Sequence, residues 1–243
     1  IEGRYSFPYI PKGIYGEIRA TDKLKDSITK EIISIKNKIH RWLDIYFPEY
    51  KEVYSNIESK SGLLILKEFA LPKNIVELSS EGIVKRWKQE KFKAVGLNKA
   101  KKLEEAAKKS IGCKNITFSA RREIKLLIED YESKQKHLEL LNEDLNKLCD
   151  EIPMIKELTK INGIGIGTAV SFIAEVGDIN RFKSAKQVQK YAGLALKENS
   201  SGKHKGLTKI SKRGRKKLRT ILFRAVIPLV GKNEEFSLIY RYY

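Results

Sequence analysis

Several residue types that define common protein classes are scarce in this chain of 243 residues. It has two cysteines, Cys113 and Cys149, and no histidine at ligand spacing near them, which excludes a disulfide-rich scaffold and a zinc motif. We therefore expect a reducing, cytoplasmic setting. The most apolar stretch, residues 221–230, contains Arg224 and Pro228 and is far shorter than the roughly 20 residues of a membrane span. Nothing at the start of the sequence has the pattern of a secretory signal peptide.

Acidic residues are scarce in the last part of the chain. Lys and Arg number 49 and Asp and Glu 30, a formal net charge of +19. Residues 151–243 hold 19 basic and 7 acidic residues, and none of the acidic ones lies between Glu198 and Glu234, where eleven basic ones fall. Charge of one sign repels itself, so it indicates a polyanionic partner. Nucleic acid is the first candidate, an anionic membrane the second, and a basic surface without a specific partner the third.

Two apolar stripes at helical spacing predict a pair of long helices. The first lies within residues 16–47 and comprises Leu24, Ile28, Ile32, Ile35, Ile39, Trp42 and Tyr46. The second begins after Ser119 and comprises Ile124, Leu127, Tyr131, Leu138, Leu141, Leu145 and Leu148. Their near-heptad steps predict an antiparallel coiled coil, with residues 48–118 as a helical insertion. Asp22 and Asp26, one turn apart in the first helix, are interpreted as surface charges and not as metal ligands.

Glycines and isoleucines alternate at Gly163, Gly165 and Gly167, directly before an apolar helix. No Gly-Lys-Ser/Thr sequence closes this segment, which excludes a Walker loop, and no strand pattern precedes it as in a dinucleotide fingerprint. The pattern is typical of a helix-hairpin-helix turn. In such a turn, backbone amides up to Thr168 hold a DNA phosphate without reading the base sequence. The alternative is a tight turn that binds nothing.

A polar loop, predicted over residues 197–206, contains Ser200 and Ser201 and is followed by a run of basic residues. A serine can attack a phosphodiester when nearby cations stabilise the developing negative charge. His204 is a candidate proton shuttle, and the alternative, more common for a lone histidine in a loop, is a solvated side chain without a role. The candidate nucleic-acid-binding residues are Gly163, Gly165, Gly167, Thr168, Lys203, Lys205, Lys209, Lys212, Arg213, Arg215, Lys216 and Arg219.

A series of motifs in order resembles the C-terminal domain of the IS110 (IS116/IS110/IS902) family, the DEDD-type, bridge-RNA-guided transposases of insertion sequences. The motifs are Ile161-Asn162-Gly163-Ile164-Gly165, Gly177-Asp178-Ile179, Arg181-Phe182, Tyr191-Ala192-Gly193-Leu194, Ser201-Gly202, Ile210-Ser211-Lys212-Arg213-Gly214 and Leu218-Arg219. The resemblance is dense over residues 151–243 and loose over residues 16–150.

The resemblance implies an enzyme of a mobile genetic element, a DNA transposase or recombinase that cleaves and transfers DNA strands through a covalent phosphoserine intermediate. The serine directly before glycine, Ser201, matches the family's nucleophile. Ser200 is the alternative, because it stands where the family commonly has Gln. The implied partners are the DNA of the element ends and target, a structured guide RNA and further protomers, with no membrane.

The resemblance also implies Mg²⁺, held by acidic residues of an N-terminal RuvC-like domain. Because those residues are expected upstream of Ile1, we expect this chain to hold no metal and to be inactive alone. Residues 1–15 are then a connector from that domain, residues 16–150 the coiled-coil region, and residues 151–243 the C-terminal transposase domain, truncated after Tyr243. The expected location is the cytoplasm of a bacterium or archaeon, in association with the nucleoid.

The predicted fold class is mainly α, with long antiparallel coiled-coil helices, a helical insertion and a small helical domain containing a helix-hairpin-helix-like motif. A second hypothesis for function is a non-catalytic helix-hairpin-helix module that binds DNA or RNA and oligomerises through the coiled coil. A third, a basic membrane-surface protein, is disfavoured because glycine-containing loops interrupt the cationic segment.

Overall fold

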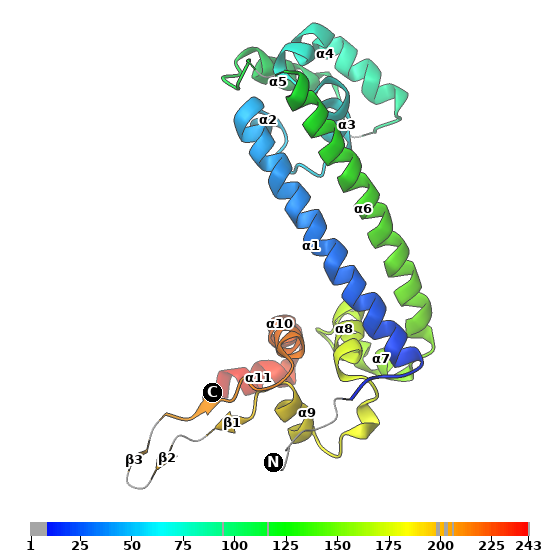
Figure 1. Ribbon diagram of the computed structural model, residues 1–243, viewed down its shortest axis with the longest axis vertical. Helices are drawn as coiled ribbons and strands as arrows, with labels where there is room; N and C mark the ends of the chain where they lie inside the picture. The colour runs from blue at the N-terminus through cyan, green and yellow to red at the C-terminus, as the bar shows by residue number, and fades with distance from the viewer. Residues whose placement is uncertain are drawn as a thin grey trace, which may run out of the picture. The chain divides into compact units, whose positions relative to one another are not determined.

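The computed structural model describes residues 9–93, 95–115, 117–197, 200–201, 204–205 and 207–242. Most of these residues lie in α-helices, which confirms the prediction of a mainly α protein (Figure 1). The chain divides into two compact units. We call residues 27–139 the central unit, and the residues up to Asp26 together with those from Leu140 onward the terminal unit. None of the helices in the described ranges is both long enough and apolar enough to cross a membrane.

Helices α1 (Ile14–Tyr46) and α6 (Phe118–Asp150) are the longest elements, and they run antiparallel within the central unit. The indole nitrogen of Trp42 donates a hydrogen bond to the carbonyl of Ala120 (2.9 Å), and Lys134 pairs with Glu31 (2.6 Å). The predicted stripe is buried from Ile28 to Trp42, as expected for an apolar seam. Leu24, which the stripe also included, is instead exposed. A coiled-coil type of side-chain packing stays a prediction.

The segment between these helices is helical, as expected, and completes the central unit. It forms α2 (Tyr50–Val53), α3 (Lys60–Phe69), α4 (Pro72–Gln89) and α5 (Leu97–Lys108). Pro72 stands in the first turn of α4, where its missing N–H costs nothing. The buried Trp87 of α4 donates to the carbonyl of Ser61 in α3 (3.0 Å), which ties these two helices together.

The terminal unit is built around α8 (Ile166–Val176), the most apolar of its helices. Its core joins α8 to the beginning of α1, the end of α6 and α7 (Pro153–Thr159). The buried members are Ile18, Leu145, Cys149, Ile152, Ile155, Ala169, Val170, Ile173 and Ala174. The unit therefore contains more than residues 151–243, the predicted C-terminal domain, because both long helices contribute turns to its core.

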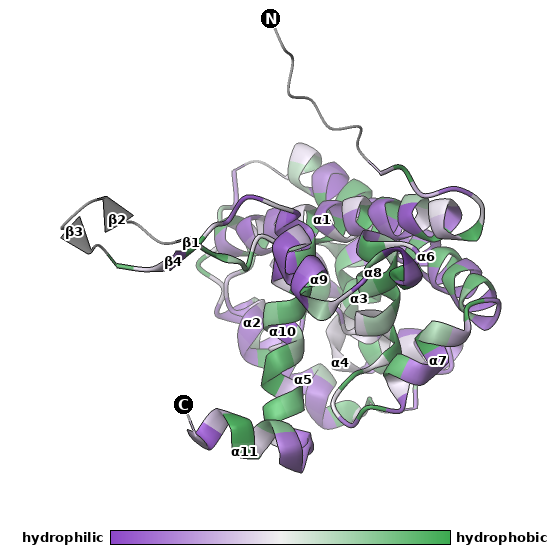
Figure 2. Ribbon diagram, turned by 90° about the horizontal axis from the view of Figure 1, so that it is seen from below, coloured by the Kyte–Doolittle hydropathy of each residue, from purple (hydrophilic) through white to green (hydrophobic). Residues whose placement is uncertain are grey.

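The rest of the terminal unit carries the basic segment. A short 3₁₀ helix, η1 (Ile179–Arg181), and α9 (Ala185–Tyr191) follow α8, and α10 (Lys216–Lys232) and α11 (Glu234–Tyr242) end the described chain. The later turns of α10 are coloured as hydrophobic in Figure 2. They supply Ala225 and Leu229 as buried residues.

Between α9 and α10 the chain forms two short antiparallel pairs. Strand β1 (Leu196–Lys197) pairs with β4 (Lys209–Ile210), and β2 (Ser200–Ser201) pairs with β3 (His204–Lys205). The polar loop predicted over residues 197–206 is therefore partly a β-ribbon (Figure 1).

Candidate nucleic-acid interface

The three glycines that precede α8 have different surroundings. Gly163 adopts a φ of +101°, and a β-carbon there would lie 2.7 Å from the carbonyl oxygen of Pro228 and 2.8 Å from the α-carbon of Leu229. Gly165 and Gly167 have nothing within 4 Å of such a β-carbon. Gly163 is therefore required by the turn and by the close approach of α10, whereas Gly165 and Gly167 leave the surface open.

The N-terminus of α8 is exposed beside this turn. Gly165 is its N-cap, and the Gly165 carbonyl accepts the amides of Thr168 (3.0 Å) and Ala169 (3.1 Å). Helix N-termini present backbone N–H groups and the positive end of the helix dipole, so they attract anions. The arrangement of α7, glycine turn and α8 suits the predicted contact with phosphate, which stays a prediction for Gly163, Gly165, Gly167 and Thr168.

The segments that enter and leave the β-ribbon, residues 191–195 and 211–215, are joined to each other by backbone hydrogen bonds. We call these two segments the ribbon root. The amide of Ser211 donates to Ala195 (2.8 Å), that of Lys212 to Gly193 (2.9 Å), and that of Arg215 to Tyr191 (2.9 Å). A β-carbon on Gly214 would lie 2.5 Å from the Gly193 nitrogen and 2.5 Å from the Tyr191 carbonyl oxygen. The Arg213-Gly214 motif thus serves a close backbone approach.

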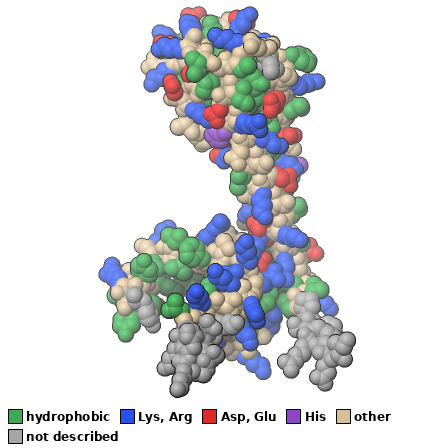
Figure 3. Space-filling view, turned by 60° about the vertical axis from the view of Figure 1, so that its left-hand side comes forward, with side chains coloured by type: hydrophobic (Ala, Val, Ile, Leu, Met, Phe, Trp, Pro, Cys, Tyr) green, Lys and Arg blue, Asp and Glu red, His purple; other side chains and the backbone are tan. Residues whose placement is uncertain are grey.

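Four of the candidate basic residues at and beside the ribbon root point into solvent: Lys209, Lys212, Arg213 and Lys216. Within the described part of the chain, these four have no acidic partner. Figure 3 shows Lys and Arg side chains gathered over the lower half of that view, where acidic ones are few. Unpaired exposed cations of this kind are available to phosphate groups.

Other basic residues of the same run face into the protein. Arg215 Nε donates to Glu175 Oε2 of α8 (2.6 Å), and the side chain of Glu175 is only 7% exposed. Arg219 Nη1 donates to the carbonyls of Ala192 (2.8 Å) and Lys212 (3.4 Å) in the ribbon root. The hydrogen bond to Glu175 raises the pKa of the Arg215 guanidinium, because the pair stabilises its charged form.

Lys217 makes the third inward contact, and it corrects our interpretation of Asp22. Asp22 is buried (2% exposed) and is not a surface charge; it accepts hydrogen bonds from Lys217 (2.5 Å) and from the hydroxyl of Ser171 (2.9 Å). Asp26 also pairs with Lys217 (2.6 Å). Burial acts to lower the pKa of Lys217, but the hydrogen bonds to both carboxylates leave that pKa raised.

The two candidate nucleophiles lie in strand β2. Its backbone register places Ser201 opposite His204 and Ser200 opposite Lys205. Gly202 and Lys203 lie outside the described residues, as do the side chains of Ser200, Ser201, His204 and Lys205. The choice of Ser201 over Ser200, and the roles of Lys203 and Lys205, therefore stay predictions.

Two residues of this interface were not selected from the sequence. Glu175 is the only charged residue of α8, and a lone acid in an apolar helix is a signal for a buried ion pair. Arg19 of α1 donates from Nε to the carbonyl of Ala174 and from Nη2 to that of Glu175, both at 2.7 Å. It satisfies carbonyls at the end of α8, but at a sequence separation of about 155 residues no local pattern identifies it.

Acidic residues that could hold a metal are not grouped in the described part of the chain. No cluster of three or more His, Cys, Asp or Glu side chains occurs there in a position to bind an ion. The nearest arrangement, Asp22 with Asp26, is already occupied by the ammonium group of Lys217. The described residues therefore do not fit a Mg²⁺ site.

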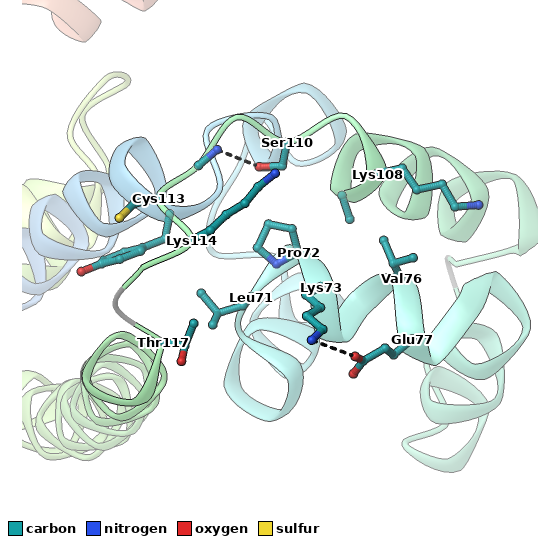
Figure 4. Close-up of a pocket in the computed structure, with 13 residues that line it drawn as sticks. Leu71, Pro72, Lys73, Val76, Glu77, Lys108, Ser110, Cys113, Lys114 and Thr117 are labelled. Carbon is teal, nitrogen blue, oxygen red and sulfur yellow. Dashed lines mark hydrogen bonds and ion pairs between the residues drawn. The ribbon is translucent and has the colours of Figure 1, made fainter.

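A cavity of about 580 Å³ lies in the central unit, remote in sequence from the predicted site (Figure 4). Its apolar wall includes Leu71, Pro72 and Val76. Two of its lysines have acidic partners, Lys73 with Glu77 (3.9 Å) and Lys108 with Glu104 (2.6 Å). None of the candidate residues lines this cavity.

Known proteins are similar to the segment that contains the glycine turn and the ribbon root. Residues 155–241 match the model of the Transposase IS116/IS110/IS902 family. The transposase for insertion sequence element IS1111A of Coxiella burnetii is 39% identical over 95 residues, which are 39% of this chain and 23% of that protein. The probable family 20 transposase of Pseudomonas aeruginosa is 37% identical over 76 residues, 30% of this chain and 22% of that protein.

A third relative, the putative transposase y4qE of Sinorhizobium fredii, is 34% identical over 86 residues, 33% of this chain and 22% of that protein. The chain thus spans less than a quarter of the length of these relatives. The family match runs from α7 through the glycine turn, the ribbon root and α10 into α11. Residues 155–241 of the chain are thus similar to the IS116/IS110/IS902 family of transposases.

Proposed function

We propose that this chain supplies the serine nucleophile and the DNA-phosphate contacts of an insertion-sequence transposase. The observation that carries the proposal is the family match over residues 155–241, which encloses the ribbon with Ser201 and the exposed cations at its root. The substrate is DNA of the element ends and of the target. The reaction is phosphodiester transesterification.

The proposed reaction has two balanced steps. First, the Ser201 hydroxyl loses its proton and its oxygen forms a bond to the DNA phosphorus, while a sugar oxygen leaves the phosphorus and takes up a proton. The DNA end is then held as a phosphoserine ester. Second, the hydroxyl of another DNA strand attacks the same phosphorus, and the serine oxygen leaves and regains a proton. The number of phosphodiester bonds is conserved, so no external energy source is needed.

The exposed cations support both steps. The phosphorus carries additional negative charge on its oxygens in each pentacoordinate transition state, and fixed cations stabilise that charge. Lys209, Lys212, Arg213 and Lys216 are available for this purpose, and the N-terminus of α8 offers a further phosphate contact. Because these contacts go to phosphate and not to base edges, they position the DNA without selecting its sequence.

Selection of the DNA site, in this proposal, belongs to a structured guide RNA. Mg²⁺ would be held by residues other than those described, in a RuvC-like domain of the transposase. Further protomers would assemble with the chain through the paired helices α1 and α6. The active complex would be located in the cytoplasm, at the nucleoid.

The test is to trap the covalent intermediate. The chain is assayed within a complete transposase, with guide RNA, Mg²⁺ and a DNA duplex that is interrupted near the cleavage point, so that the released strand diffuses away. We expect a protein–DNA adduct that withstands denaturation. Ser201→Ala should abolish the adduct and leave DNA affinity within about twofold of wild type, since the hydroxyl contributes little binding energy.

Ser200→Ala is the matched control and should still form the adduct. Loss of the adduct in Ser200→Ala but not in Ser201→Ala would move the nucleophile by one residue. Adduct formation in both variants would show that neither serine is the required nucleophile. Absence of the adduct in the wild type as well, while DNA still binds, would favour a non-catalytic helix-hairpin-helix module that binds DNA or RNA.

A further inference from the structure

The basic run from Lys212 to Arg219 contains cations of two kinds. Lys212, Arg213 and Lys216 are exposed, whereas Arg215, Lys217 and Arg219 each have partners inside the terminal unit. A run of like charges at this density is usually treated as one phosphate-binding surface. The contacts separate it into two sets.

Arg215 has the contacts of a structural link. Its side chain reaches Glu175 in α8, its amide donates to Tyr191 at the end of α9, and it is the N-cap of α10. One residue therefore connects three helices at the ribbon root. Arg219, one turn further along α10, extends the same link by donating to the carbonyl of Ala192.

Glu175 makes it costly for Arg215 to leave this position. The Glu175 carboxylate is almost fully buried, and a buried carboxylate without its cation is strongly destabilising. A phosphate that drew Arg215 outward would leave that charge unpaired, and an approaching phosphate would itself be repelled by Glu175. Lys212 and Arg213 carry no such constraint within the described residues.

We propose that Arg215, together with Glu175, is a positioning residue that fixes the root of the ribbon bearing Ser201, and that phosphate is bound by Lys212, Arg213 and Lys216. Of these two assignments, only the second, phosphate binding by the three exposed residues, rests on the proposed function. The first, positioning by Arg215, concerns the order of the ribbon root in the protein without DNA. An experiment can therefore contradict either assignment without contradicting the other.

The first measurement is amide hydrogen exchange in the chain without DNA, at the amides of Ser211, Lys212 and Arg215. Glu175→Gln, Arg215→Gln and Arg215→Lys should each speed exchange there, by about ten- to a hundredfold in Arg215→Gln, because a hydrogen bond between charged groups is lost. The double variant Glu175→Gln/Arg215→Gln should exchange no faster than Arg215→Gln, since one contact is removed in both. Lys216→Gln is the matched control and should leave these amides unchanged.

The second measurement is the salt dependence of affinity for a DNA duplex. Lys212→Gln should reduce the slope of log K against log salt by about 0.9, the value for one phosphate contact. Arg215→Gln should leave the slope unchanged. In the hydrogen-exchange experiment, the amides of the central unit serve as an internal reference. A variant that unfolds entirely would exchange faster at these amides as well as at the ribbon root.

Two results would overturn the assignment. A reduced salt slope in Arg215→Gln with unchanged exchange at the ribbon root would make Arg215 a phosphate ligand. A gain in DNA affinity in Glu175→Gln that disappears in Glu175→Gln/Arg215→Gln would mean that Glu175 competes with DNA for Arg215. If the wild type does not bind DNA at all, the proposed function fails, and the exchange data still decide whether Arg215 positions the root.

Discussion

Single residues of the terminal unit owe their roles to partners distant in the sequence. Asp22 and Asp26 have the spacing of two charges on an exposed helix face, and no local pattern indicates that either is buried. The structure buries Asp22 because Lys217, 195 residues later, neutralises it and Ser171 satisfies its other oxygen. Such a pairing depends on the tertiary fold, so local periodicity cannot predict it.

Lys217→Met tests this pair at the residue scale. The substitution keeps the apolar stem but leaves the buried Asp22 carboxylate without a cation, which is strongly destabilising. Because a third of the Lys217 side chain is exposed, we expect a smaller effect than for a fully buried ion pair. The expected loss in the free energy of unfolding is about 2 kcal/mol. Chemical denaturation measures it. Lys216→Met on the exposed side should change the unfolding free energy by less than about 0.5 kcal/mol.

The same pair predicts a dependence on alkaline pH. The pKa of Lys217 is raised in the folded protein, so its contribution is fully present below the ordinary lysine value of 10.5 and is lost as the pH rises through the folded value. The stability difference between wild type and Lys217→Met should therefore shrink above pH 10.5. A difference that stays constant or grows there would contradict the ion pair.

Elements of this protein differ in how far the sequence specifies them. The long helices follow from apolar residues at steps of three and four, and Pro48 and Pro72 mark the end of α1 and the start of α4. The β-ribbon was expected as a loop, because its strands are two residues each and therefore too short for a periodic pattern.

The glycine turn illustrates the same limit within one motif. Its location and the helix after it were predictable from Gly163, Gly165 and Gly167. The different surroundings of the three glycines were not predictable, because they depend on the position of α10. Only Gly163 combines a positive φ with the backbone of Pro228 and Leu229 at less than 3 Å.

Gly163→Ala tests the turn as an element. A β-carbon would face both an unfavourable backbone conformation and a collision with α10, so we expect a loss of about 3 kcal/mol in the free energy of unfolding. Gly167→Ala, in the first turn of α8 with open space around it, should be neutral or stabilising by about 0.5 kcal/mol. Equal effects of the two substitutions, measured by thermal or chemical denaturation, would contradict this assignment.

The whole molecule carries its excess charge unevenly, and the distribution was visible in the sequence. Residues 151–243 have 19 basic and 7 acidic residues, and the family match falls in the same part. The sequence does not show which of these basic side chains have partners within the protein and which have none. Arg215, Lys217 and Arg219 have hydrogen-bond partners within the terminal unit, whereas Lys209, Lys212, Arg213 and Lys216 are exposed and have no acidic partner among the described residues.

DNA binding by the chain itself is the property that the exposed cations predict most directly. Equilibrium binding to a DNA duplex is measured over a range of salt concentrations, for the wild type and for a variant with Lys209, Lys212, Arg213 and Lys216 all changed to Gln. We predict a steep fall of affinity with salt in the wild type. The slope of the variant should be smaller by about 3 to 4, at about 0.9 for each phosphate contact removed. A wild-type affinity that does not depend on salt, or a variant with the wild-type slope, would contradict the account.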